Sequence, residues 1–275
     1  MTKCCLGKRV TQGLLLGLTS FSGPLSFGAT AEEPMTLYAV KYGESLYPAS
    51  KLLKGDTSGK LLPIAWMFYA VKAGKEVVLV DTGFSDTNEA AHSGVTLLPY
   101  QPALAAAGIT PDSVTKIVLT HTHSDHAANT PLYPKATVIV NQRESDSVFL
   151  KTVGPDRLVT FDQSYQVLPG MTVRLVGGHT KGSSYVEVKM GEKTYFLAGD
   201  ESYLPENLTK LIPVGSLVDA AANLAFLTMA QNSGAEVLTF HDPARVTNGC
   251  VRPISAGRPK RLPAHADAAA QRPSS

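Results

Sequence analysis

Short apolar runs recur along the chain, and each is closed by polar or glycine residues. Runs of this kind, rich in β-branched side chains, predict buried strands. They cover residues 35–40, 64–73, 76–80, 116–120, 137–140, 171–176, 185–188, 195–198 and 237–240. The early runs are joined by short hairpin connections such as Ala73-Gly74-Lys75. This order favours sheets with helices on the outside over a doubly wound parallel sheet.

The segments between these runs predict helices and one long loop. Residues 103–107 suit a short helix, because Pro102 precedes them and Gly108 stops them. Residues 143–151 predict a second helix, and residues 216–230 predict a third with Ser216 as its cap. Residues 43–62 are rich in Gly, Ser and Lys, which predicts an exposed loop.

The strand over residues 116–120 runs into a cluster of metal-ligand side chains, His121-Thr122-His123-Ser124-Asp125-His126. Imidazole and carboxylate groups suit zinc and similar divalent ions. A lone histidine is more often a surface or core residue, but four ligand types in six residues at a strand end are hard to explain by packing. They exceed what one zinc needs from one loop, which indicates a two-metal site.

The same pattern recurs at other strand ends. A ligand-type residue closely follows an apolar strand at Asp81, His121, His179, Asp200 and His241. Strand ends along one edge of a sheet framework can gather distant residues into a single site. We therefore expect these side chains to converge.

Composition and charge narrow the class of protein. The chain has 275 residues, of which 44% are hydrophobic and 17% charged, with a net charge of +2, as in an ordinary globular protein. No basic stripe with interleaved aromatic residues supports nucleic-acid binding. We expect one domain over residues 32–255 and a disordered tail over residues 256–275.

Residues 1–31 have the features of a secretory signal. Lys3, Lys8 and Arg9 precede an apolar stretch that begins at Leu14, and Ala29-Thr30-Ala31 is a small-x-small cleavage site. The stretch is too short and too rich in glycine for a spanning helix, so we expect no stable membrane insertion. A secreted or periplasmic location follows, with cleavage after Ala31 and with Cys250 as the single remaining cysteine.

In the order of its motifs, the chain resembles the metallo-β-lactamase superfamily. The motifs are Val80-Asp81-Thr82-Gly83, His121-x-His123-x-Asp125-His126, Gly178-His179-Thr180, Gly199-Asp200 and His241. The resemblance implies an α+β protein with the αββα sandwich fold, in which two mixed sheets pack face to face with helices outside. The metal site would lie at one edge between the sheets.

Within that superfamily, the chain is most similar to the dinuclear-zinc N-acyl-homoserine lactonases. Asp200-Glu201-Ser202-Tyr203 resembles their Asp-x-x-Tyr motif, and His241-Asp242 resembles the context of their last ligand. Four positions differ from the lactonase pattern: Ala128 and Asn129 replace the glycines of Ala-Gly-Gly, and Gly177 and Lys181 replace prolines. These differences leave the ligand types unchanged but affect the loops that face a substrate.

The resemblance implies a complete ligand set for two divalent ions, expected to be Zn²⁺. The ligands would be His121, His123 and His179 for one ion, Asp125, His126 and His241 for the other, and Asp200 shared by both. A hydroxide between the ions would open the lactone ring of a small-molecule substrate. Tyr203 would donate a hydrogen bond to the carbonyl oxygen, and Asp125 or Asp200 would return a proton to the ring oxygen.

Several alternatives stay open. The chain could be another hydrolase of this fold, such as a β-lactamase or a thioester or phosphodiester hydrolase, or a metal-binding protein without catalysis. Tyr203 could be a packed aromatic residue. Asp81 is predicted to accept the free ring N–H of a ligand histidine and not to bind metal itself. Trp66, Met67, Phe68 and Phe84 are interpreted as core residues, with an acyl-chain pocket as the alternative.

Overall fold

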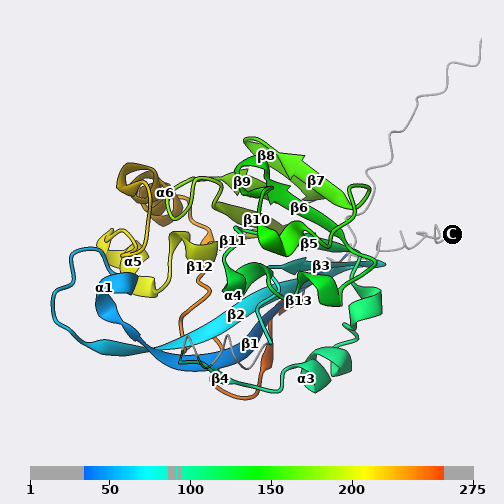
Figure 1. Ribbon diagram of the computed structural model, residues 1–275, viewed down its shortest axis with the longest axis horizontal. Coiled ribbons are helices and arrows are strands. Elements are labelled where there is room, and N and C mark those ends of the chain that lie inside the picture. The colour runs from blue at the N-terminus through cyan, green and yellow to red at the C-terminus, as the bar shows by residue number, and fades with distance from the viewer. Residues whose placement is uncertain (1–33, 86–90, 92–93, 257–275) are drawn as a thin grey trace, which may run out of the picture. The chain divides into compact units, whose positions relative to one another are not determined.

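The computed structural model describes residues 34–85, 91 and 94–256 (Figure 1). The predicted signal segment, and the predicted tail apart from Ala256, lie outside these residues, so both stay predictions. Within the described part, no helix is long and apolar enough to cross a membrane.

Strands dominate the described chain, and its helices are short. The strands are β1 (Met35–Pro48), β2 (Leu61–Ala73), β3 (Glu76–Val80), β4 (Thr96–Leu97), β5 (Lys116–Val118), β6 (Thr137–Asn141), β7 (Leu158–Phe161), β8 (Ser164–Leu168), β9 (Met171–Leu175), β10 (Ser184–Met190), β11 (Lys193–Leu197), β12 (Glu236–Leu238) and β13 (Val251–Ala256). The α-helices are α1 (Ala49–Leu52), α3 (Gln101–Ala106), α4 (Ser124–Ala127), α5 (Pro205–Lys210) and α6 (Ala220–Asn232). The 3₁₀ turns are η1 (Pro111–Ser113), η2 (Thr130–Leu132), η3 (Gln142–Glu144), η4 (Val148–Leu150) and η5 (Gly199–Glu201).

These strands form two mixed sheets. The larger has the order β13-β1-β2-β3-β5-β6-β7, with β4 paired to β1, and the smaller has the order β12-β11-β10-β9-β8. From β3 to β7 the neighbours of the larger sheet are parallel, whereas β13, β1, β2 and β3 are antiparallel. In the smaller sheet only β11 and β12 are parallel.

Apolar side chains on both faces of β2 show how the layers form. Met67, Tyr69 and Val71 point into the cluster between the sheets, where they meet Val186 and Leu197 of the smaller sheet. Phe68 and Ala70 alternate with them and join a second cluster, which includes residues of α1 and α3. A third cluster packs α6 against the outer face of the smaller sheet. The αββα sandwich predicted from the resemblance is confirmed (Figure 1).

The predicted loop over residues 43–62 is wrong over much of its length. β1 continues to Pro48 and β2 begins at Leu61, and these two residues face each other in the ladder. Only α1 and residues 53–60 connect the strands. Polar residues such as Glu44 and Ser45 are tolerated here because their side chains are exposed or half-buried, and main-chain pairing with β2 holds them in place.

Two predicted helices also differ from the structure. Residues 143–151 form the separate turns η3 and η4, which are capped by the side chains of Asn141 and Ser147. α6 begins at Ala220 with Asp219 as its cap, and not at Ser216. The backbone N–H groups of Val218 and Asp219 both donate to the carbonyl oxygen of Gly178, and this tertiary contact delays the helix start.

Candidate metal centre

Four of the predicted ligands lie at one end of the larger sheet. β5 ends shortly before His121 and His123, and α4 then contains Asp125 and His126. Thr82, in the loop after β3, fixes this short helix. Its backbone N–H and its hydroxyl donate to the carbonyl oxygen of His126 at 2.7 and 2.9 Å.

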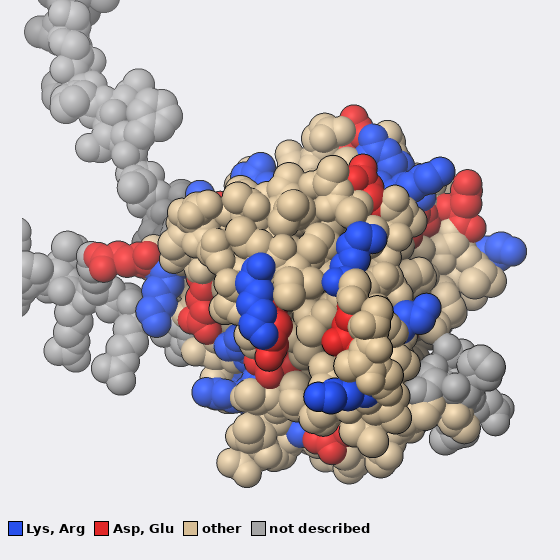
Figure 2. Space-filling model, turned by 90° about the vertical axis from the view of Figure 1, so that its left-hand side faces the viewer, with Lys and Arg blue, Asp and Glu red and all other residues tan. Residues whose placement is uncertain are grey.

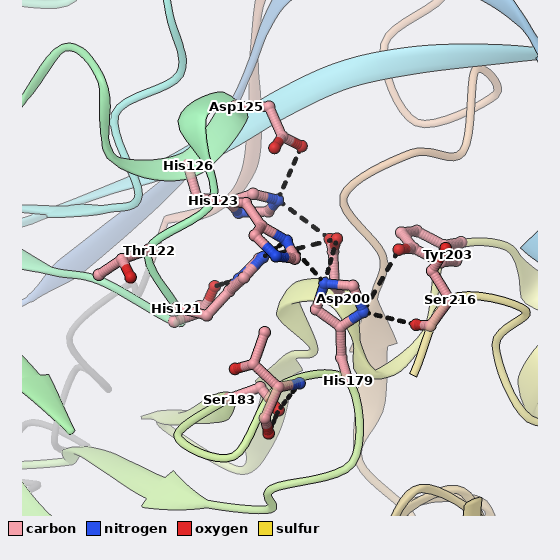
Figure 3. A network of polar contacts seen from close by, with 12 residues as sticks. His121, Thr122, His123, Asp125, His126, His179, Ser183, Asp200, Tyr203 and Ser216 are labelled. Atoms are coloured by element: carbon pink, nitrogen blue, oxygen red, sulfur yellow. Dashed lines mark hydrogen bonds and ion pairs between the residues drawn. The ribbon is translucent and has the colours of Figure 1, made fainter. Parts of the chain in front are cut away.

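The other three predicted ligands follow strands of the smaller sheet. His179 comes after β9, Asp200 lies in η5 directly after β11, and His241 comes after β12. Because the two sheets pack face to face, these strand ends meet the end of β5 at one edge. The structure therefore brings all seven side chains together. Figure 3 shows Asp200 between the rings of His126 and His179.

The first ligand group consists of His121, His123, His179 and Asp200. Nδ1 of His123 lies 3.0 Å from Nε2 of His121 and 3.0 Å from Nε2 of His179. Oδ2 of Asp200 lies 3.4 Å from Nε2 of His179 and 3.8 Å from that of His121. Three ring nitrogens and one carboxylate oxygen thus face a common point.

The second ligand group consists of Asp125, His126, His241 and, again, Asp200. Nε2 of His126 lies 3.1 Å from Oδ2 of Asp125 and 3.0 Å from Oδ1 of Asp200. Oδ1 of Asp200 is also 3.2 Å from Nε2 of His241. Asp200 therefore offers one carboxylate oxygen to each group, which is the arrangement that a shared ligand requires.

The side chains present fit a pair of divalent cations. Nε2 of His126 is buried and has no hydrogen-bond partner, although two carboxylate oxygens lie near it. A buried polar atom of this kind normally has a partner. Each group offers imidazole nitrogen and carboxylate oxygen, the donor types that zinc and its neighbours accept.

In three of the ligand histidines, the ring nitrogen that points away from the common point lies within hydrogen-bond distance of an acceptor oxygen. Nδ1 of His126 lies 2.6 Å from Oδ2 of Asp81, as predicted, Nδ1 of His179 lies 2.6 Å from the carbonyl oxygen of Ser216, and that of His241 lies 3.0 Å from the carbonyl oxygen of Ala65. A carbonyl oxygen only accepts, so Nδ1 of His179 and His241 carries the proton. In the neutral ring, Nε2 of each is then the nitrogen with the free lone pair, and it is directed at the common point.

Asp81 has an unusual backbone conformation for this task. Its φ is +66°, a value that non-glycine residues rarely adopt. Its side chain is buried, and besides His126 it accepts from the backbone N–H of Thr120 at 2.7 Å and from the Thr120 hydroxyl at 2.8 Å. Backbone strain of this kind occurs at functional sites where surrounding contacts impose it.

Burial and charge favour the protonation state that ligation needs at His121 and Asp200, whereas at His126 they favour the protonated ring, which must lose a proton before it can bind a cation. Burial holds the pKa of His121 well below its usual value, so its ring is neutral. Burial alone would raise the pKa of Asp200, but His126, His179 and His241 outweigh it and hold that pKa well below its usual value. Burial would lower the pKa of His126, but Asp200, Asp125 and Asp81 outweigh it and raise the pKa.

The ligand groups form the floor of a cavity of 530 Å³. Leu46, Pro48, Ile64 and Trp66 supply an apolar wall, which comes from the β1–β2 hairpin. Trp66 is 5% exposed and donates its indole N–H to the hydroxyl of Ser45 at 2.8 Å. Trp66 thus serves both the core and the cavity, whereas Met67, Phe68 and Phe84 are core residues, as predicted.

Tyr203 lies in the wall of the same cavity. Its side chain is buried, its hydroxyl is 3.5 Å from Nδ1 of His179, and its ring centroid is 5.1 Å from that of His241 (Figure 3). Burial raises the pKa of Tyr203 well above its usual value, and the charges of Asp200 and Asp125 raise it further. The phenol is therefore neutral and able to donate a hydrogen bond at neutral pH.

Sequence reasoning predicted no role for two carboxylates that contact the ligand loops. Glu144 binds the loops of His123 and His179, and Glu201 binds the His179 loop from within the protein. The signal in the sequence was two glycines, Gly178 and Gly182, where an added Cβ would collide with these side chains.

The fold and the paired ligand groups define a two-sheet sandwich that can hold divalent metal at one edge. The family model of the metallo-beta-lactamase superfamily matches residues 64–240. The chain belongs to this superfamily. Its fold and ligand groups are those of a metal-dependent hydrolase.

Two relatives are similar to this chain at low sequence identity. The N-acyl homoserine lactonase AiiA of Bacillus thuringiensis subsp. kurstaki is 24% identical over 200 residues, which cover 64% of this chain and 80% of the relative. A probable metallo-hydrolase of Methanocaldococcus jannaschii is 23% identical over 168 residues, covering 60% of this chain and 70% of the relative.

Solved structures agree on the fold. An N-acyl homoserine lactone hydrolase with the product N-hexanoyl-L-homoserine at its catalytic metal centre aligns with a TM-score of 0.66 and 21% identity, over 76% of this chain and 94% of that one. AidC, a dizinc quorum-quenching lactonase, aligns with a TM-score of 0.61 and 17% identity, over 81% of this chain and 95% of that one.

Proposed function

We propose that this chain hydrolyses the lactone ring of N-acyl homoserine lactones, with two divalent cations, most suitably Zn²⁺, held by the two ligand groups. The observation that carries the proposal is the position of Tyr203. Its neutral phenol lines the cavity next to both groups, where it can reach a carbonyl oxygen. The relatives named as lactonases support the same substrate class.

His121, His123 and His179 would hold one cation, Asp125, His126 and His241 the other, and Asp200 both. When bound, such a pair lowers the pKa of water towards about 7 and polarises a carbonyl oxygen.

The residues of this chain supply orientation and proton transfer. Tyr203 donates a hydrogen bond to the carbonyl oxygen as that oxygen gains charge, an interaction worth about 2.7–4 kcal/mol in comparable sites. Asp125 is the more accessible carboxylate, with its side chain 16% exposed, against 4% for Asp200. Asp125 is therefore better placed to accept the proton of the attacking water and to return it to the ring oxygen that leaves.

The cavity suits an acylated, uncharged substrate. The apolar wall from the β1–β2 hairpin can pack against an acyl chain, and the polar floor can receive the lactone. On the face of the molecule that carries α1, α5 and α6, basic and acidic side chains are interspersed and do not gather by sign (Figure 2). This face therefore gives no electrostatic preference for a highly charged ligand.

The test is a substrate panel on the purified, zinc-loaded chain. It compares homoserine lactones of increasing acyl length with a β-lactam, a thioester and a phosphodiester. We expect the highest kcat/KM for an acylated lactone, loss of that activity on chelation, and recovery on adding Zn²⁺. Clear turnover of another class without lactone turnover would overturn the lactonase assignment.

A further inference from the structure

Glu144 binds the two loops that carry the histidines of the first ligand group. Its Oε2 accepts from the backbone N–H of Thr122 at 3.2 Å and from the Thr122 hydroxyl at 2.7 Å. Its Oε1 accepts from the hydroxyl of Thr180 at 2.6 Å and from the backbone N–H of Gly182 at 3.1 Å. Each carboxylate oxygen therefore serves one loop.

These two loops belong to different sheets. Thr122 separates His121 from His123 after β5 of the larger sheet, and Thr180 follows His179 after β9 of the smaller one. The Glu144 side chain thus fixes the distance between strand ends of two separate sheets. Gly182 permits its close approach, because an added Cβ would lie 2.5 Å from Cγ of Glu144.

Glu201 holds the same His179 loop from the protein interior. Its fully buried carboxylate accepts from the backbone N–H groups of Gly178 and His179, each at 3.1 Å, and from the hydroxyl of Ser183. The amide of Asn223 donates to its other oxygen at 2.6 Å. A buried carboxylate is costly unless such donors surround it, so the contact defines one loop conformation.

Neither carboxylate has a lysine or arginine in ion-pair contact within the described part of the chain. Their partners are the backbone and the hydroxyl or amide groups of the loops. Within the described residues, the two carboxylates therefore bind these loops and do not neutralise a basic side chain.

We propose that Glu144 and Glu201 are positioning residues that set the spacing of His121, His123 and His179 before a cation binds. The inference rests on the proposed metal centre but not on the lactone substrate. The second ligand group is oriented separately, by Asp81 and by the carbonyl oxygen of Ala65. Loss of the contacts of either glutamate should therefore lower the affinity for the cation held by the first group, and not the affinity for the cation held by the second group.

Glu144→Gln is the sharpest variant because it keeps the shape of the side chain. Both oxygens of Glu144 accept from a backbone N–H, which cannot reverse its polarity. A glutamine must direct its NH₂ group at one of these N–H donors, in either orientation. One loop is then released while the other stays bound.

The matched control is Glu76→Gln. Glu76 also accepts from a threonine hydroxyl, that of Thr115, and from Lys116 at 2.6 Å, where it joins β3 to β5. It contributes to neither ligand group and does not line the cavity. The control reports what the loss of a carboxylate between strands does in general.

The experiment measures the affinity of each variant for Co²⁺ and Zn²⁺ by competition with a chromophoric chelator. We expect Glu144→Gln and Glu201→Gln to lower the affinity for one of the two cations about 10- to 100-fold, which is the usual effect of losing a group that orients a ligand. Shifted imidazole resonances of the Co²⁺ form should show that the weakened cation is the one bound by three histidines. Glu76→Gln should bind both cations as the parent does.

If the glutamine variants do not fold, a variant that removes a single hydrogen bond can still test the positioning role. Thr180→Val removes one hydroxyl donor to Glu144 and should lower the affinity for the same cation by a smaller factor than Glu144→Gln does. Unchanged affinity for both cations in folded variants would overturn the positioning role. A parent that binds no cation would instead overturn the proposed metal centre.

Discussion

The two ligand groups share Asp200 but are supported in different ways. The first group lies on loops, its His123 is exposed, Glu144 ties its two loops together, and Glu201 holds the His179 loop. The second group is more deeply buried, and its histidines are oriented by Asp81 and by a main-chain oxygen of β2. We call the second group the framework half, because its histidines are oriented from β2 and from the residue that follows β3, and the first group the loop half, because glutamate side chains hold its two loops.

This difference indicates which half of the centre can change its metal affinity more easily. The oxygen of Ala65 that binds His241 belongs to β2, which pairs with β1 at this point, and the backbone N–H of Ala65 also donates to the carbonyl oxygen of His241, so this contact is fixed by main-chain atoms. The loops of the first group depend on a few side-chain contacts and face the cavity directly. Changes in metal affinity should therefore arise more easily in the loop half.

Asp200→Ala removes the ligand that joins the halves and should have the largest effect. Both groups lose an oxygen, and four histidines lose the anion that faces them. We expect loss of both cations and a fall in kcat/KM of more than about 100-fold, beyond the effect of an outer contact. Metal content and activity measure this. Retention of two tightly bound cations would show that the halves are independent.

Tyr203→Phe should leave both halves intact while it removes a donor at the cavity wall. The ring keeps its packing against His179 and His241. We expect kcat to fall about 10²- to 10³-fold, with two cations still bound. Steady-state kinetics and metal analysis measure this, and equal rates in variant and parent would return Tyr203 to a packing role.

Asp81→Asn should lower the affinity for the cation held by the framework half and leave the affinity for the other cation unchanged. Asparagine tolerates the positive φ of this position, so the backbone should be kept. Its NH₂ group would face Nδ1 of His126 and favour a proton on Nε2, where a cation should bind. We expect about a 10- to 100-fold loss of affinity for the cation bound by two histidines. An equal loss for both cations would contradict the separation of the halves.

Leu46→Ser lies outside both groups and should have the smallest effect. The side chain is 61% exposed at the cavity mouth, so only part of its surface can pack on a substrate. At about 0.8 kcal/mol for each buried methylene, we expect a 3- to 10-fold rise in KM for long acyl chains only. The same rise for short and long chains would remove Leu46 from the acyl contact.

Local motifs allowed the ligand types to be predicted, because they cluster in the short segments that follow β5, β9, β11 and β12. Asp81 and His126 show this well, since their pairing follows from two adjacent parallel strands, β3 and β5. The layered fold followed from the resemblance and from the apolar runs, as in β2.

Other features depend on contacts between distant segments and left no local pattern. Ser216 and Asp219 are both good helix caps, and only the bonds from Val218 and Asp219 to Gly178 decide between them. β8 was not predicted because its first residues are exposed and polar. Glu144 lies in a segment whose sequence predicts a helix. Its contacts with the two ligand loops depend on the packing of the two sheets and leave no local pattern in the sequence.

The most direct test of the account is a crystal structure of the zinc-loaded chain with anomalous diffraction data at the zinc edge. The account predicts two peaks, one enclosed by His121, His123 and His179 and one by Asp125, His126 and His241, with Asp200 bound to both. A single peak, or peaks away from these side chains, would contradict it.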